Sequence, residues 1–334
     1  MDSVHPPLSS TYLALWFTLA GWKPIVARIA MLLLAAFALT NVFLLARRVS
    51  KLGVAVAATV ATATYPIFFV QSSLTHADLA AAAFTLWGVR LGIERRLWWS
   101  QLALSLAVLS KETAIITPAA LALWEIFFAK TDDGNSAAAR LERAAIRLVP
   151  VVPLAAWLVF HYHVTGHIFG DTAFTRYNVT QTLNPLRFFL ALALRAWHMF
   201  GIMSMLPLTA AMIVAMFFPP VVDKSGERPR IAIPLQIQFA LIILAHLVTF
   251  SIVGGAALTR YLLPVYPLVI IVAMSTLHRR ILRWEWPAAI MVIFLGLALN
   301  LTKIVGLQVR QIAFSLFASL VNLVALASQP FDVV

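Results

Sequence analysis

The sequence predicts an all-α, polytopic integral membrane protein with about ten transmembrane helices. Hydrophobic residues make up 62% of the 334 residues and charged residues only 11%, whereas soluble domains carry roughly 25% charged residues. The mean hydropathy is +0.90. The 25 lysines and arginines give a net charge of +12, and most of them gather in short clusters at the ends of apolar segments. Such clusters orient a membrane protein, and they do not form the continuous groove that nucleic acid needs.

The first segments already show this alternation of apolar runs and cations. Residues 1–22 contain a His-Pro-Pro motif and then an apolar, aromatic stretch. Two adjacent prolines cannot lie inside a helix, so we expect a loop followed by a short or interfacial helix. Pro24–Ala46 is long enough to cross a hydrocarbon core of about 30 Å. The cations at residues 47–51 follow it and place its end in the cytoplasm.

The later apolar segments alternate in direction, and the cation clusters between them agree with a single orientation. We expect Trp98–Leu109 and Thr113–Phe128 to be short for full spans and to form a shallow or tilted hairpin. Phe188–Phe218 is long enough for an interfacial helix followed by a span. The other expected spans are Leu52–Val70, Ala77–Ile93, Leu148–Val164, Pro234–Val253, Leu262–Leu277 and Pro287–Leu301.

The chain divides into a transmembrane domain over residues 1–304 and a C-terminal tail over residues 305–334. The tail contains a further apolar run at residues 312–327. Two interpretations of the tail stay open, because a run of this length can lie on the membrane surface or form an additional helix.

Five segments with unusual polar residues fall on the non-cytoplasmic side in this orientation. Ionisable groups at such a depth are costly, so they usually serve a pathway or a site. The sequence therefore predicts an active site at this face of the membrane. The five segments are His5-Pro6-Pro7, Ser72–Asp78, Lys111-Glu112, Gly166–Arg187 and Thr259–Tyr261.

Asp78 and the Lys111-Glu112 pair are the main candidates for chemistry. A carboxylate at Asp78 can position a sugar or a metal or accept a proton; alternatively, it is a structural residue that the dipole at a helix N-terminus favours. Lys111 can hold a phosphate as a point charge. The alternative for Lys111 and Glu112 is a self-compensating ion pair at a solvated turn.

Arginine, tyrosine and histidine residues complete the candidate binding set. Arg260 can bind a phosphate with two hydrogen bonds, although Arg260 and Tyr261 also suit an interfacial anchor. His76 lies two residues before Asp78, so on one helix the two side chains would point to different sides. Arg28 lies about one turn inside its span and can snorkel outward or meet a lipid phosphate.

The sequence indicates no certain cofactor. It contains no cysteine, which excludes thiolate metal sites and disulfides. His161, His163 and His167 have a spacing that is unsuitable for one helix face, so we assign no metal ligands. A divalent cation stays an open alternative.

The motifs, in their order, resemble those of the GT-C membrane glycosyltransferases. The closest likeness is to bacterial branches similar to the protein O-mannosyltransferases and the aminoarabinose transferase of lipid A. The resemblance covers residues 4–130 well and residues 255–275 less well. The matching segments are HPPL, ARIAMLLLAAFALTNVFLLARR, SSLTHADLAAAAFTLWG, LAVLSKETAIITPAALALWE and TRYLLPVYPL.

The resemblance implies an enzyme that takes a sugar from a polyprenyl-phosphate carrier and passes it, usually with inversion, to a lipid, polysaccharide or protein acceptor. It implies the bacterial inner membrane, with the active site on the extracytoplasmic face. The Pro-Pro motif places His5 near the phosphate, and the family's second-loop acidic position matches Asp78. The family's later lysine and Arg-Tyr positions match Lys111 and Arg260-Tyr261.

The start of the chain departs from this family pattern. Relatives carry an earlier span and an acidic first loop with the principal catalytic aspartate, whereas Asp2 is the only acidic residue before His5 here. We therefore expect a fragment in which Asp2 is the candidate for that role. Two alternatives to the enzyme remain. One is a transporter or lipid flippase, which should show inverted repeats and mid-membrane charges, and the other is a catalytically incomplete relative.

Overall fold

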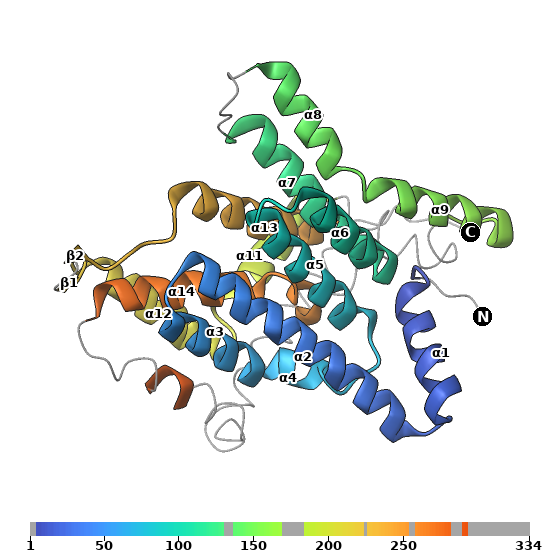
Figure 1. Ribbon diagram of the computed structural model, residues 1–334, viewed down its shortest axis with the longest axis horizontal. Helices are drawn as coiled ribbons and strands as arrows, with labels where there is room; N and C mark the ends of the chain where they lie inside the picture. The colour runs from blue at the N-terminus through green and yellow to red at the C-terminus, as the bar shows by residue number, and fades with distance from the viewer. Residues whose placement is uncertain are drawn as a thin grey trace.

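The computed structural model describes residues 5–129, 136–168, 184–223, 226–253, 258–281 and 289–292. These residues fold almost entirely into helices, and the only strands among them form one short hairpin (Figure 1). This agrees with the predicted all-α class. The N-terminal helices are α1 (Leu8–Ala20), α2 (Pro24–Val49), α3 (Leu52–Thr64), α4 (Pro66–Gln71), α5 (Ala77–Ile93), α6 (Leu97–Ser110), the 3-10 helix η1 (Glu112–Ile115) and α7 (Ile116–Phe127).

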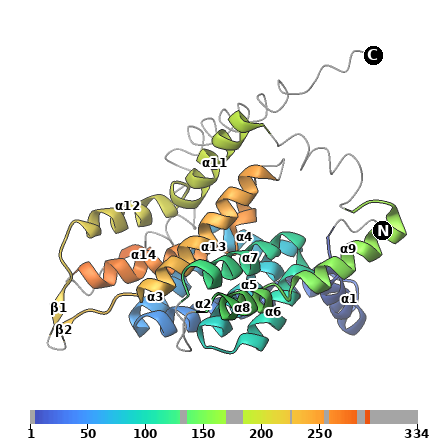
Figure 2. The same ribbon diagram turned by 90° about the horizontal axis from the view of Figure 1, so that it is seen from above.

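The second part of the chain packs against this N-terminal group, with α14 against α3 and α13 against α7. Its helices are α8 (Ala137–Arg147), α9 (Val151–Thr165), α11 (Pro185–Phe200), α12 (Met205–Met216), α13 (Ile233–Ile252), the 3-10 helix η3 (Thr259–Leu262) and α14 (Tyr266–Arg280). The antiparallel strands β1 (Val222–Asp223) and β2 (Gly226–Glu227) lie between α12 and α13. Figures 1 and 2 both place this hairpin at one end of the long axis, and α1 and α9 at the other.

The centre of the bundle is packed through small side chains. Buried alanines line the facing sides of α2, α3 and α5, including Ala38, Ala58 and Ala83, each of which is fully buried. Small residues let helices in a membrane approach closely, so that dispersion contacts hold them together. The apolar face of α14, from Tyr266 to Leu277, packs into the same core.

Gly88 fixes the contact between α5 and α6. A Cβ at this position would lie 2.6 Å from Cγ of Leu104 and 3.3 Å from the carbonyl oxygen of Ser100, so the two helices meet closer than an alanine allows. The hydroxyl of Ser100 donates a 2.7 Å hydrogen bond to the Gly88 carbonyl oxygen. This tight pair brings the start of α5 beside the end of α6.

Two helices are long and apolar enough to cross a membrane by themselves, among the residues that the structure describes. They are α2 and α13, and the bent pairs α8–α9 and α11–α12 raise the number to as many as four. The bend between α11 and α12 is 83°, which agrees with the predicted interfacial helix followed by a second segment. Helices α1, α3 and α6 are apolar but shorter. The predicted total of about ten spans stays a prediction, because most of residues 282–334 lie outside the described part.

The last turns of α5, α8 and α14 each carry an arginine that pairs with a carboxylate. The guanidinium of Arg147 donates hydrogen bonds of 3.0 and 2.8 Å to the buried carboxylate of Glu125, which links α7 to α8. Arg279, at the end of α14, pairs with Glu227 of β2 at 2.8 Å. Arg90, in the last turn of α5, pairs with Glu94 at 2.8 Å. The candidate site lies at the N-terminal ends of α5 and α14, away from the cations in the last turns of these two helices.

Candidate active site

Asp78 lies in the first turn of α5, and its side chain is buried. His76 is the last residue before the helix. Its backbone is extended (φ −99°, ψ 144°), so α5 begins directly after it. Unsatisfied N–H groups at a helix N-terminus favour a negative charge. The structural alternative for Asp78 therefore has support, but its side chain also binds two cations from other segments.

Lys111 is the first of these cations. It stands between α6 and η1 in an extended conformation (φ −155°, ψ 128°), and its Nζ donates a 2.6 Å hydrogen bond to Oδ1 of Asp78. Both side chains are less than 10% exposed. The same Nζ lies 4.4 Å from the centre of the Tyr261 ring. Lys111 is thus held by a carboxylate and by the face of an aromatic ring, both of which favour a cation.

Arg260 of η3 is the second cation. Its Nε lies 3.4 Å from Oδ2 of Asp78, and its Nη1 lies 3.4 Å from Nδ1 of His76. The expectation that His76 and Asp78 point to different sides applies only where both residues lie on one helix. His76 lies outside α5 on extended chain, so one guanidinium reaches both residues. His76 Nδ1 also lies 3.0 Å from Oε1 of Gln71.

Glu112 does not pair with its neighbour Lys111. Its Oε2 lies 2.9 Å from Nδ1 of His5, which joins the segment before α1 to η1. The hydroxyl of Ser9 adds a 3.3 Å hydrogen bond to the carbonyl oxygen of Ser110. The predicted alternative of a self-compensating Lys111–Glu112 pair is wrong. Lys111 is extended, and successive side chains on extended backbone point in opposite directions.

The surroundings shift the pKa of three of these groups. Burial raises the pKa of the Glu112 carboxyl, but the hydrogen bond from His5 and nearby positive charge outweigh burial and lower it overall. Burial and then the charge of Arg260 lower the pKa of His76. Burial and then the charge of Asp78 raise the pKa of the Tyr261 hydroxyl. At neutral pH the site therefore holds a carboxylate at Glu112, a neutral imidazole at His76 and a neutral phenol at Tyr261.

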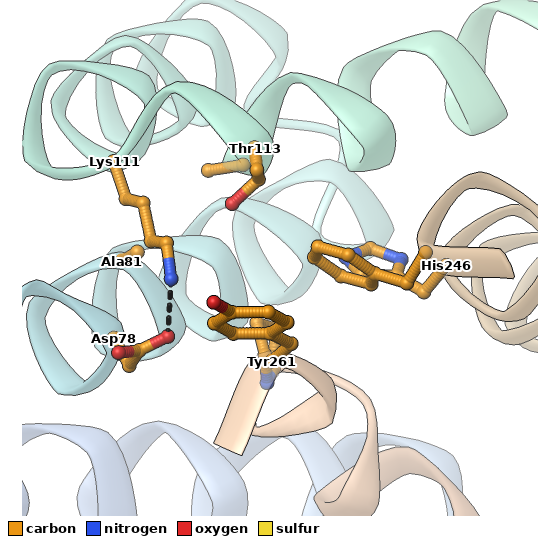
Figure 3. Close-up of a pocket in the computed structure, with 9 residues that line it drawn as sticks. Asp78, Ala81, Lys111, Thr113, His246 and Tyr261 are labelled. Carbon is orange, nitrogen blue, oxygen red and sulfur yellow. Dashed lines mark hydrogen bonds and ion pairs between the residues drawn. The ribbon is translucent and has the colours of Figure 1, made fainter. Parts of the chain in front are cut away.

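A small pocket opens beside the Asp78–Lys111 pair. Figure 3 shows the pair on one side of the pocket, with the ring of Tyr261 in its middle and His246 on the opposite side. The ring of Tyr261 stacks on Phe250 with centroids 5.4 Å apart. The side chains that line the pocket include Asp78, Lys111, Thr113, His246, Phe250 and Tyr261.

Arg195 of α11 supports the aromatic wall of this pocket from behind. It is 1% exposed, and its Nη1 donates a 2.8 Å hydrogen bond to the carbonyl oxygen of Leu258. Its guanidinium carbon lies 5.5 Å from the centre of the Tyr261 ring and 5.8 Å from that of Phe250. Arg195 thus ties η3 to the end of α13.

Sequence reasoning missed two residues of the candidate site, Thr113 and His246, and left Arg195 without a definite role. Thr113 follows the Lys111-Glu112 segment and could have been found from that position. His246 is a lone histidine in an apolar helix, and no sequence signal separates such a residue from a structural one. Arg195 shares one face of α11 with His198, a spacing that suits either a cavity-lining residue or one that snorkels to the membrane surface. Its role depends on α11 lying against α13 and η3.

Two predicted site residues do not join this cluster. Arg28 lies exposed on α2, and it makes no hydrogen bond or ion pair with any residue in the described part of the chain. It is therefore placed as a surface residue and not as a ligand of the pocket. Asp2 lies outside the described residues, so its role stays a prediction.

A divalent cation has no evident place at this site. Within the described ranges, no group of three or more His, Asp or Glu side chains could hold a metal ion. Both carboxylate oxygens of Asp78 already lie against cations, on Lys111 and Arg260. A metal ion there would have to displace them, and like charges at this distance repel strongly. The residues present do not fit a metal site at Asp78.

Comparison with known proteins supports the same fold. The model of the dolichyl-phosphate-mannose-protein mannosyltransferase family matches residues 4–157. ArnT from Cupriavidus metallidurans has a similar structure, both bound to undecaprenyl phosphate (TM-score 0.59, 20% identity) and in the apo state (TM-score 0.59, 18% identity). Each match covers 96% of this chain, which spans 59% and 58% of the two ArnT chains. No curated protein sequence matches the chain significantly.

These findings define an integral membrane protein with the GT-C fold. The chain is similar in sequence to the dolichyl-phosphate-mannose-protein mannosyltransferases over its N-terminal part and in structure to ArnT over nearly its whole length. The resemblance predicted from the sequence is confirmed.

Proposed function

We propose that this chain belongs to a membrane glycosyltransferase that moves a sugar from a polyprenyl-phosphate carrier to an acceptor at the extracytoplasmic face of the membrane. The observation that carries the proposal is the cluster around the buried carboxylate of Asp78, at which two cations from separate segments, the buried Lys111 and the partly exposed Arg260, meet. The match of ArnT bound to undecaprenyl phosphate supports the choice of donor.

The orientation follows from the placement of charge along the helices. The cluster lies at the start of α5, whereas Arg90 lies in its last turn. It also lies before α14, whose last turn carries His278, Arg279 and Arg280. Cation-rich ends face the cytoplasm in membrane proteins, so the cluster belongs on the other side.

The proposed reaction uses the cluster in two ways. An acceptor hydroxyl oxygen forms a bond to the anomeric carbon, and the bond from that carbon to the phosphate oxygen breaks with its electron pair. The leaving polyprenyl phosphate gains negative charge, which Lys111 and Arg260 are placed to stabilise. Asp78 accepts the hydroxyl proton. As the phosphate draws the two cations, an oxygen of Asp78 becomes available to the acceptor.

Binding of the bare lipid phosphate tests the proposal. The full chain, purified in nanodiscs, is titrated with undecaprenyl phosphate and, in parallel, with undecaprenol, which lacks the phosphate. We expect the phosphate to bind at least tenfold more tightly, and Arg260→Met to reduce that advantage by about tenfold, because one charge-assisted contact is lost. Arg279→Met is the matched control, since it removes an arginine at the opposite end. Equal binding of the two lipids would overturn the proposed donor.

A further inference from the structure

His246 stands out among the residues that line the pocket, because it is a polar side chain in an otherwise apolar stretch of α13. It is 1% exposed, and its ring reaches the pocket from the side opposite Asp78 and Lys111 (Figure 3). The reaction proposed above assigns it no role.

A backbone hydrogen bond fixes the tautomer of His246. Its Nδ1 lies 2.9 Å from the carbonyl oxygen of Ile242. A carbonyl oxygen can only accept, so Nδ1 must carry the hydrogen. In the neutral ring the other nitrogen, Nε2, is then an acceptor. Nε2 has no hydrogen-bond partner among the residues that the structure describes.

Two residues with hydroxyl groups also line the pocket. Thr113 and Tyr261 line the pocket with His246, and neither hydroxyl has a hydrogen-bond partner within the described part of the chain. The phenyl ring of Phe250 completes this side of the pocket. Figure 3 shows the Tyr261 hydroxyl turned towards Asp78 and Lys111, so the rest of the pocket offers the acceptor nitrogen of His246, the Thr113 hydroxyl and aromatic surface.

We propose that His246, with Thr113, forms a subsite that recognises a hydroxyl group of the transferred sugar. The inference rests on the proposed function and deepens it. One sugar hydroxyl matches this small pocket, because it can donate to Nε2 of His246 and accept from Thr113. The phosphate is expected at Lys111 and Arg260, so the phosphate and the sugar of the donor contact different residues.

The test separates the sugar from the phosphate. The full chain in nanodiscs is titrated with undecaprenyl phosphate and with the same lipid carrying mannose, glucose or an aminopentose. In the unmodified protein we expect at least one sugar to raise the affinity over that of the bare lipid. His246→Leu should reduce that gain by about tenfold, which is the usual size of one lost hydrogen bond in a buried site. It should change the affinity for bare undecaprenyl phosphate by less than about twofold.

Two further variants separate recognition from structure. His246→Gln keeps an acceptor on the same helix face and should restore part of the sugar-dependent gain. Gln238→Leu removes another buried polar side chain of α13, at a position that does not line the pocket, and should leave both affinities unchanged.

Each other outcome overturns the subsite. Equal weakening of both lipids by His246→Leu would give His246 a purely structural role. A sugar-dependent gain that survives His246→Leu would place the sugar elsewhere, and the absence of any gain in the unmodified protein would remove the sugar from this pocket. Failure of the bare phosphate to bind would overturn the proposed donor itself, together with the subsite.

Discussion

Replacement of Asp78 by asparagine is expected to remove the carboxylate that pairs with the buried Lys111. Lys111 and Asp78 are 7% and 8% exposed, and their charged atoms are 2.6 Å apart. At an effective dielectric constant of about 20, this separation corresponds to a gross attraction of about 6 kcal/mol. Desolvation of both groups offsets much of it. Arg260 is 32% exposed, so solvent screens its contact, which we value at below about 1 kcal/mol.

Asp78→Asn should therefore lower the free energy of unfolding by about 3 kcal/mol, chiefly because Lys111 keeps its charge without a carboxylate. The double variant Asp78→Asn with Lys111→Met removes both charges, and it should recover most of the loss. Denaturant titration in mixed micelles, followed by tryptophan fluorescence, measures all three proteins under one condition.

The reasoning is refuted if Asp78→Asn unfolds at the same denaturant concentration as the unmodified chain, because Lys111 would then need no partner. It is also refuted if the double variant is as unstable as the single one. That result would mean that the shape of Asp78, and not its charge, supports the bundle.

Two further predictions concern other titratable groups. Glu125→Gln should lower the free energy of unfolding by about 3 kcal/mol, because Arg147 is 7% exposed and loses a carboxylate at 2.8 Å. The affinity of the same variant for undecaprenyl phosphate should change by less than about twofold. A larger change would contradict the separation of the Glu125–Arg147 pair from the candidate site. His76 has a lowered pKa, so the unfolded chain binds more protons than the folded chain between the two pKa values. Stability should therefore fall as the pH drops below about 6.5, and the fall should be smaller in His76→Gln. Denaturant titrations of both proteins at several pH values measure this. Identical pH profiles of the variant and the unmodified chain would contradict the prediction.

The meeting of three polar segments at one place could be predicted from the sequence. Polar segments at Asp78, Lys111 and Arg260 recur at the ends of apolar runs, and cations mark the other ends, so alternation alone brings the three together. The structure confirms that they meet. The pairing within the cluster could not be predicted in the same way, because it depends on backbone directions at single residues, such as the extended conformation of Lys111 that turns Glu112 towards His5.

Helix packing, which the sequence does not specify, determines which other residues join the candidate site. Arg28 has the same sequence signature as a site residue, namely a cation one turn inside an apolar helix, but it lies on the exposed face of α2. Arg195 has a weaker signature, and it is buried behind Tyr261 because α11 crosses the end of α13 there. Hydropathy does not specify which face of a membrane helix turns inward when both faces are apolar, and His246 was missed for the same reason.

Transfer of a labelled sugar tests the central claim most directly. Membranes that contain the full chain are incubated with undecaprenyl phosphate carrying a labelled sugar, and the label is followed into acceptor fractions while released undecaprenyl phosphate is measured. The account predicts that both products rise together and that Arg260→Met, which retains the Lys111–Asp78 pair, greatly reduces both. If the chain binds the donor but the label never leaves the lipid, with any of the sugars tried, the proposed transferase activity is contradicted.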